Sequence, residues 1–140
     1  MSEIPIGHKG ERKERVSAGI AVDFMGQPGA RVLGTPYLIG LLEMTARDSI
    51  KPLLDDGYDT VGTEVNVRHL AATPMGMSVV FQSEVVSVEG RRVRFKVEAW
   101  DEKEKISDGI HERFIVHVGR FAERLDAKRK AHLSRAAASR

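Results

Sequence analysis

The sequence predicts an α+β fold in which one long antiparallel β-sheet wraps around a central apolar helix. Two observations favour it. A stretch of helical character near residues 36–50 is apolar on nearly every side, which is typical of a helix inside a protein. Four later segments alternate between apolar and polar residues, as strands with one buried face do. A long sheet can cover such a helix, whereas a two-stranded ribbon cannot.

Length and composition favour one globular domain. The 140 residues are 41% hydrophobic and 30% charged, which is enough for a substantial core. We expect one domain over residues 1–140, with a loose N-terminus over residues 1–13. No apolar run reaches the roughly 18 residues of a membrane span, and no export signal is present. With no cysteine in the chain, we predict a cytoplasmic protein without a membrane partner.

The positive charge is concentrated at the C-terminus. Residues 120–140 hold seven Lys or Arg and two acidic residues, a net charge of +5, whereas the whole chain carries +2. We expect a basic C-terminal helix or tail with solvated charges there, and attraction to nucleic acid or cofactor phosphates is the weaker alternative. No aromatic residue follows Phe121 to stack on a base, so we predict no nucleic-acid partner.

The elements follow in order. A first strand is expected over residues 16–24, and a loop with three glycines and a proline over residues 25–34. Thr35 offers a hydroxyl for the helix N-cap, and Pro36 is favoured at the first helical position. Pro52 marks the helix end. Four further strands and a C-terminal helix are expected over residues 59–70, 77–88, 92–99, 106–118 and 121–131, with a tight hairpin turn at Glu89-Gly90.

Five motifs lie within roughly residues 14–125. They are Thr35-Pro36 with Gly40 and Glu43, Thr60-Val61-Gly62-Thr63, His69-Leu70-Ala71-Ala72-Thr73-Pro74-Met75-Gly76, Val88-Glu89-Gly90-Arg91-Arg92 and Gly109-Ile110-His111-Glu112-Arg113. In residue types and spacing these motifs resemble hotdog-fold thioesterases, and most of all the branch typified by fluoroacetyl-CoA thioesterase. The His-x-Ala-Ala-Thr-Pro stretch is the most specific of them.

The resemblance implies a hotdog fold and hydrolysis of an acyl-CoA substrate without a cofactor. It implies a catalytic group made of Thr35, Glu43 and His69. It also implies a homodimer, or a dimer of dimers, with the active site between subunits. Fluoroacetyl-specific members use aromatic residues before the Thr as a lid, and residues 25–34 contain none. The implied substrate is therefore a small or short-chain acyl-CoA, without implying fluoroacetyl-CoA itself.

Each candidate catalytic residue also has a structural interpretation. Thioester hydrolysis needs a nucleophile or activated water, an acid–base group and donors to the oxyanion. Glu43 could be a general base or a nucleophile, or only a buried acid paired with an arginine. Thr35 could be only an N-cap and His69 only a core histidine. Eight helical residues rise about 12 Å, so Thr35 either folds back in its loop or meets Glu43 of another subunit.

Two residues are candidates for substrate binding. Gly62 offers bare backbone for the close approach of a ligand, and a β-bulge is the alternative. Arg113 could hold a substrate carboxylate or balance Glu43, and an outward surface arginine is an equal alternative. His111 and His117 share its strand face, but such a pair is weak evidence for a metal site, so we predict none.

Two other functions fit parts of the pattern. A hotdog hydratase or dehydratase would act on an enoyl thioester with a histidine and an acid, but its usual helix signature is not in this sequence. A non-catalytic acyl-CoA-binding module would keep the pocket without turnover. The presence of Thr35, Glu43 and His69 together argues against that module.

Overall fold

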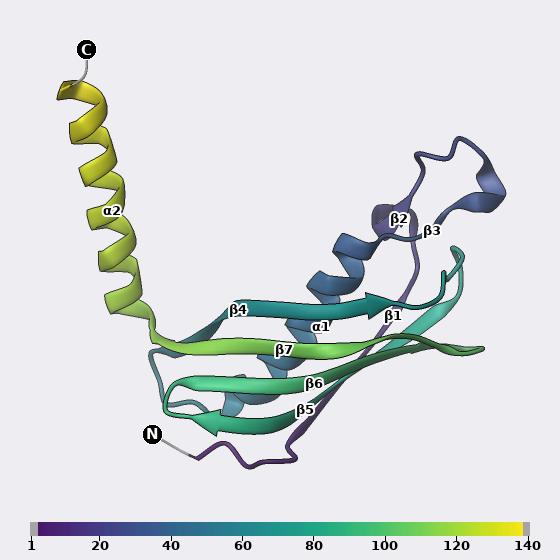
Figure 1. The fold of residues 1–140 in the computed structure, drawn as a ribbon, viewed down its shortest axis with the longest axis horizontal. Coiled ribbons are helices and arrows are strands. Elements are labelled where there is room, and N and C mark those ends of the chain that lie inside the picture. The colour runs from purple at the N-terminus through teal and green to yellow at the C-terminus, as the bar shows by residue number, and fades with distance from the viewer. Residues whose placement is uncertain (1–2, 139–140) are drawn as a thin grey trace.

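A five-stranded antiparallel sheet lies against one side of helix α1 (Thr35–Ile50) in the computed structural model, which describes residues 3–138 (Figure 1). In spatial order the strands are β1 (Lys9–Arg15), β5 (Ser78–Glu89), β6 (Arg92–Asp101), β7 (Lys105–His117) and β4 (Tyr58–His69). A small ribbon pairs β2 (Ala21–Val22) with β3 (Val32–Leu33), and 3-10 turns occupy Ala18–Ile20, Pro28–Ala30 and Lys51–Leu53. The predicted fold, a long sheet wrapped around a central helix, is confirmed.

One face of α1 builds the core. Leu38, Leu42, Ala46 and Ile50 recur every four residues and are all buried, together with Phe81, Phe95 and Val97 of the sheet. Burial of each Leu or Ile side chain is worth roughly 1.5–3 kcal/mol.

The prediction that α1 is enclosed on nearly every side is wrong. Tyr37 is 46% exposed and Met44 is 44% exposed. The sheet covers one face of the helix, and the opposite apolar face stays open beside the free edge of β4.

The prediction of a loose N-terminal segment is also wrong. Residues 9–13 are not loose, because they belong to β1, which pairs antiparallel with β5. The strand expected over residues 16–24 is replaced by a 3-10 turn and the two residues of β2. The polar sequence of β1 carries no apolar alternation, as is usual for a charged edge strand. Residues 1–2 and 139–140, which were part of the predicted N-terminus and tail, lie outside the described residues.

A β-bulge shifts the faces of β4. The pairing register with β7 changes between Gly62 and Glu64, where one extra residue enters β4. Directly paired residues share a face, and Thr60 pairs with buried Ile115, so Thr60 and Gly62 face α1. His69 lies on that face, as predicted. Strict alternation counted back from His69 would place Val61 and Thr63 on that face too, but the bulge puts them on the opposite face.

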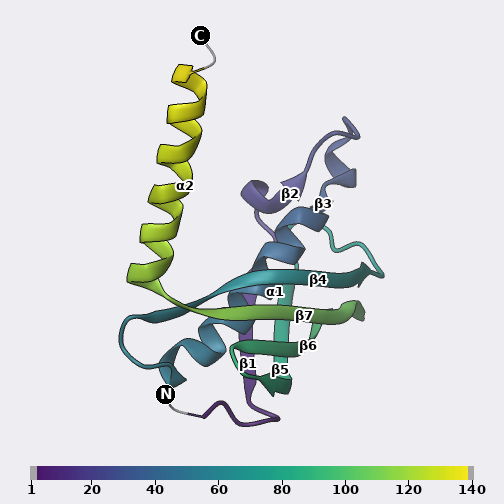
Figure 2. The same cartoon turned by 60° about the vertical axis from the view of Figure 1, so that its left-hand side comes forward.

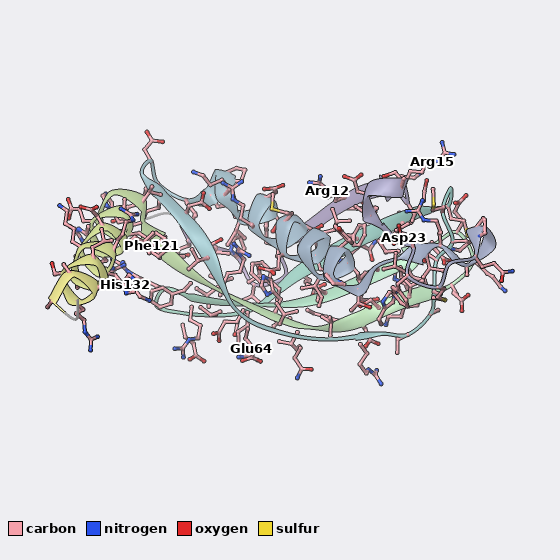
Figure 3. All side chains as sticks on the ribbon, turned by 90° about the horizontal axis from the view of Figure 1, so that it is seen from above. Arg12, Arg15, Asp23, Glu64, Phe121 and His132 are labelled. Atoms are coloured by element: carbon pink, nitrogen blue, oxygen red, sulfur yellow. The ribbon has the colours of Figure 1, made fainter. Side chains whose placement is uncertain are left out.

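The C-terminal helix is longer than expected and stands away from the sheet. Helix α2 (Val118–Ala138) continues directly from β7, and none of its described residues is buried (Figure 2). Phe121 and His132 mark it at one end of the molecule, opposite the end that carries Asp23 (Figure 3). Among residues 3–138, no helix is long and apolar enough to cross a membrane.

Gly109 offers a test of the sheet. A Cβ at this position would meet the carbonyl oxygen of Asn66 and would lie 2.6 Å from Cα of Val67, and backbone atoms cannot move aside as a side chain can. We expect Gly109→Ala to lower the free energy of unfolding by about 2 kcal/mol or more, measured by urea denaturation. Gly29→Ala is the control, because its Cβ would meet no atom within 4 Å. A loss no larger than that of the control would contradict the packing described here.

Candidate active site

Thr35 and His69 form one half of the candidate site. Thr35 is the first residue of α1 and His69 the last of β4, and Thr35 Oγ1 lies 2.8 Å from Nδ1 of His69. The N-cap is Gly34, and no side chain caps the helix, so the expectation that Thr35 caps it is wrong. The hydroxyl of Thr35 bonds the histidine instead.

The surroundings of His69 favour its neutral form. Burial lowers the pKa of His69 below its ordinary value of 6.5. A neutral ring has one accepting nitrogen, so when Nδ1 accepts from the Thr35 hydroxyl the proton lies on Nε2. Nε2 is buried and has no hydrogen-bond partner within residues 3–138. In that tautomer the pair combines a hydroxyl beside a base with a buried N–H that has no partner within residues 3–138.

Glu43 and Arg113 form the other half. Arg113 Nη1 donates to Oε2 of Glu43 at 3.4 Å. Arg113 is only 7% exposed, so the interpretation of an outward surface arginine is wrong. Thr60 holds its guanidinium, since Nε donates to Oγ1 at 2.7 Å and Nη2 donates to the carbonyl oxygen at 2.9 Å. The Glu43 side chain is 35% exposed, so it is less buried than its helix had predicted and can be reached by a ligand.

Gly62 makes room for the Glu43 carboxylate. A Cβ on Gly62 would lie 2.5 Å from Oε2 of Glu43 and 3.5 Å from Nη1 of Arg113. The same glycine borders the bulge of β4. The bulge offered as the alternative for Gly62 is therefore present, whereas the predicted approach of a ligand stays a prediction. The approaching group in this structure is the carboxylate of Glu43.

The two halves do not meet within one chain. Thr35 begins α1, and Glu43 follows eight residues later, a rise of about 12 Å. Within residues 3–138 no hydrogen bond or ion pair joins Thr35 or His69 to Glu43 or Arg113. Thr35 lies in the helix, so the alternative in which it folds back in its loop is wrong.

A pocket of about 430 Å³ opens beside Thr35 and His69. Its walls are mostly apolar, and they are formed by Val22, Phe24, Met25, Val32, Leu33, Gly34, Pro36, Leu70, Ala71 and Ala72. Phe24 is 78% exposed, and sequence reasoning missed it, because alternation assigned it to a buried strand face. An aromatic side chain thus borders the pocket, although residues 25–34 contain none.

His111 is a second residue that sequence reasoning undervalued. It is buried beside Arg113, whereas His117 packs edge-on against Tyr58 at a ring-centroid distance of 5.1 Å. Within the described part of the chain, no cluster of three or more His, Asp or Glu side chains is arranged to hold a metal. The absence of a metal and of a cofactor stays a prediction.

Known proteins are similar over most of the chain. A model of the fluoroacetyl-CoA-specific thioesterase family matches residues 16–119. Fluoroacetyl-CoA thioesterase from Streptantibioticus cattleyicolor is 37% identical over 100 residues, which cover 71% of this chain and 72% of that protein. The solved structure of the fluoroacetyl-CoA thioesterase FlK has a TM-score of 0.82 at 30% identity, over 90% of this chain and 98% of that one.

Two further structures extend the comparison. A hypothetical protein of the thioesterase superfamily from Thermus thermophilus has a TM-score of 0.84 at 29% identity, over 96% of this chain and 98% of that one. A hot-dog-like protein from Thermanaerovibrio acidaminovorans has a TM-score of 0.81 at 24% identity, over 89% and 92% of the two chains, and shows the fold alone.

The fold and these similarities define the class, which is the hotdog-fold thioesterases. Within that class, the chain belongs to the family of fluoroacetyl-CoA-specific thioesterases. The predicted resemblance is confirmed. The catalytic roles of Thr35, Glu43 and His69, and the binding roles of Gly62 and Arg113, stay predictions.

The half-buried His69 and the buried His111 predict how stability depends on pH. Burial lowers the pKa of both His69 and His111 below 6.5, so the unfolded chain binds more protons than the folded one at acid pH. The two neutral rings make their full contribution to the free energy of unfolding above about pH 6.5. This contribution is lost as the pH falls through that value toward the pKa values of the folded state. We expect NMR titration midpoints below 6.5 for both rings, and a lower free energy of unfolding at pH 5.5 than at pH 7.5. A variant with both histidines replaced by Gln should show a smaller difference, and midpoints above 6.5 would contradict the assignment.

Proposed function

We propose that this protein hydrolyses a small or short-chain acyl-CoA to the free acid and CoA. The observation that carries the proposal is the bond between Thr35 Oγ1 and Nδ1 of His69 at the wall of an apolar pocket, in a chain of a thioesterase family. Such a pocket accepts a small acyl group, and the paired hydroxyl and imidazole supply the polar groups that a thioester needs. The cytoplasmic location stays a prediction.

Each polar group has a role in this reaction. The thioester carbonyl lies beside Thr35 and His69. The hydroxyl of Thr35 donates to Nδ1 and holds the ring, so that the N–H at Nε2 of His69 stabilises the developing oxyanion. Glu43 takes a proton from water, whose oxygen attacks the carbonyl carbon. The C–S bond then breaks, and the leaving thiolate takes the proton from Glu43 to depart as the CoA thiol. In the alternative route Glu43 attacks the carbonyl carbon itself, and water then opens the anhydride. A single turnover in H₂¹⁸O can show the second route, since ¹⁸O enters Glu43 only when water opens the anhydride at the Glu43 carbonyl.

Gly62 and Arg113 bind the acyl-CoA substrate in this proposal. The backbone of Gly62 is open to solvent beside Glu43 and lets the substrate approach. Arg113 places a cation 3.4 Å from Oε2 of Glu43, and this buried charge attracts the polarised carbonyl. Phe24 borders the pocket and limits the length of the acyl chain that enters.

We further propose that the working unit is a homodimer paired through β4. Three features support this: β4 is an edge strand, Tyr37 and Met44 leave an apolar helix face open beside it, and the two halves of the site lie apart in one chain. A two-fold axis between two β4 edges would bring Glu43 of one subunit toward Thr35 and His69 of the other. A dimer of such dimers is the alternative assembly.

An assay of thiol release distinguishes the proposed hydrolysis from two rival functions. An acyl-CoA-binding module would bind acyl-CoA without releasing thiol. A hydratase or dehydratase would change an enoyl-CoA without releasing thiol.

The first test is hydrolysis of an acyl-CoA series, followed with a thiol reagent. We expect turnover of short chains, and a loss of at least about 100-fold in kcat for Glu43→Gln, because the acid–base group is gone. Asp48→Asn is the matched control, since Asp48 is an exposed acid on the same helix that pairs with Arg47, and it should keep its activity. No thiol release from any acyl-CoA, or equal losses in both variants, would refute the proposed reaction.

The second test asks whether one site uses two subunits. Thr35→Val and Glu43→Gln chains should each be inactive, but unfolding and refolding them together should restore up to about a quarter of wild-type activity, because half of the dimers then hold one intact site. Refolding each variant alone is the control. Inactive mixtures that contain the mixed dimer would contradict the shared site, and a monomer on sizing would contradict the dimer.

A further inference from the structure

His111 is a buried histidine that the reaction above does not use. It lies on the face of β7 toward α1 and is 1% exposed. Its ring stacks on Phe95 of β6 at a centroid distance of 6.0 Å and an interplanar angle of 24°. Nδ1 lies 2.8 Å from the carbonyl oxygen of Glu64, and Nε2 lies 3.2 Å from Nη1 of Arg113. Three strands therefore fix the ring.

The partners of the ring determine its tautomer. A carbonyl oxygen only accepts, so Nδ1 must carry the proton that it donates to Glu64. A guanidinium only donates, so Nε2 must accept from Nη1 of Arg113. His111 is therefore a neutral Nδ1–H imidazole, and its free lone pair points at the arginine.

The same nitrogen of Arg113 also faces the catalytic candidate. Nη1 contacts Nε2 of His111 on one side and Oε2 of Glu43 on the other. We propose that His111 is a positioning residue, a neutral acceptor that aims Nη1 of Arg113 at the Glu43 carboxylate. The inference rests on the proposed hydrolysis, in which Glu43 reacts, and His111 itself touches no reacting atom.

Protonation of His111 would undo this arrangement. An N–H at Nε2 would then face Nη1 of Arg113, and two cations would lie 3.2 Å apart. The charged side chains near the ring are Arg113 and Glu112 on β7 and Glu43 on α1, whereas β4 presents the carbonyl of Glu64 and β6 the ring of Phe95. Burial, aided by the charge of Arg113, lowers the pKa of His111, so the ring stays neutral at neutral pH.

Two substitutions separate positioning from packing. His111→Gln keeps an accepting oxygen near the place of Nε2 but does not titrate, whereas His111→Leu has a similar size and no acceptor. We expect His111→Leu to lower kcat for acyl-CoA hydrolysis at pH 8 by about 10- to 100-fold with little change in KM, as for a misplaced catalytic group. His111→Gln should keep most of kcat, and its activity should fall less steeply than that of wild type as the pH is lowered. His117→Gln, on the same strand but beside Tyr58, is the control and should match wild type.

The outcomes are distinguishable. Three outcomes would overturn the positioning role. They are an equal kcat for His111→Leu and wild type, an equal loss of kcat in both His111 variants, and a fall of activity at low pH in His111→Gln that is as steep as in wild type. A second measurement needs no variant and no turnover: ¹⁵N shifts of the wild-type imidazole at pH 7.5 should show a proton on Nδ1 of His111 and none on Nε2. The opposite tautomer or a cationic ring would also overturn it. An inactive wild type with the expected tautomer would instead refute the proposed hydrolysis.

Discussion

One-sided packing of α1 is the constraint on which the rest of the structure depends. Leu38, Leu42, Ala46 and Ile50 press one face of the helix against the sheet and thereby fix its rotation. With that rotation set, Glu43 lies at the boundary between the core and solvent, where it reaches Arg113 while one third of its side chain stays exposed. A helix enclosed on every side would have cut the carboxylate off from any substrate.

The bulge in β4 adapts the sheet to that helix. A regular strand would alternate without interruption, whereas the extra residue lets Thr60 and Gly62 face α1 before the bulge and His69 face it after. Thr60 can then hold Arg113, and Gly62 leaves room for the Glu43 carboxylate. One local irregularity thus serves both halves of the candidate site.

Sequence patterns predicted the parts of this protein that are governed by burial. Alternation located β4 to β7 within a few residues, and the Thr-Pro start located α1, because a buried face selects apolar side chains at a fixed period. The pattern was uninformative for β1, an edge strand of charged residues. It was misleading for Val61 and Thr63, since the inserted residue breaks the alternation and the faces before the bulge are the reverse of those extrapolated from His69. The motifs identified Thr35, His69 and Glu43, but local spacing could not show that Thr35 bonds His69 instead of capping its helix. Partners 34 residues apart in sequence are set by tertiary packing.

The hydrogen-bond lengths around Arg113 show that Glu43 is not held by a short bond. A buried guanidinium is costly unless its donors are satisfied, and here Thr60 accepts from Nε and Nη2 with bonds of 2.7 and 2.9 Å. The contact with Glu43 is 3.4 Å, longer than the 2.7–2.9 Å typical of a charge-assisted hydrogen bond. Neutral acceptors therefore supply the close bonds that hold the arginine, and the carboxylate is not required to fix it. Glu43 gains the field of a nearby cation without being tied by a short bond, which suits the proposed role of a residue that takes up a proton or attacks a carbonyl carbon.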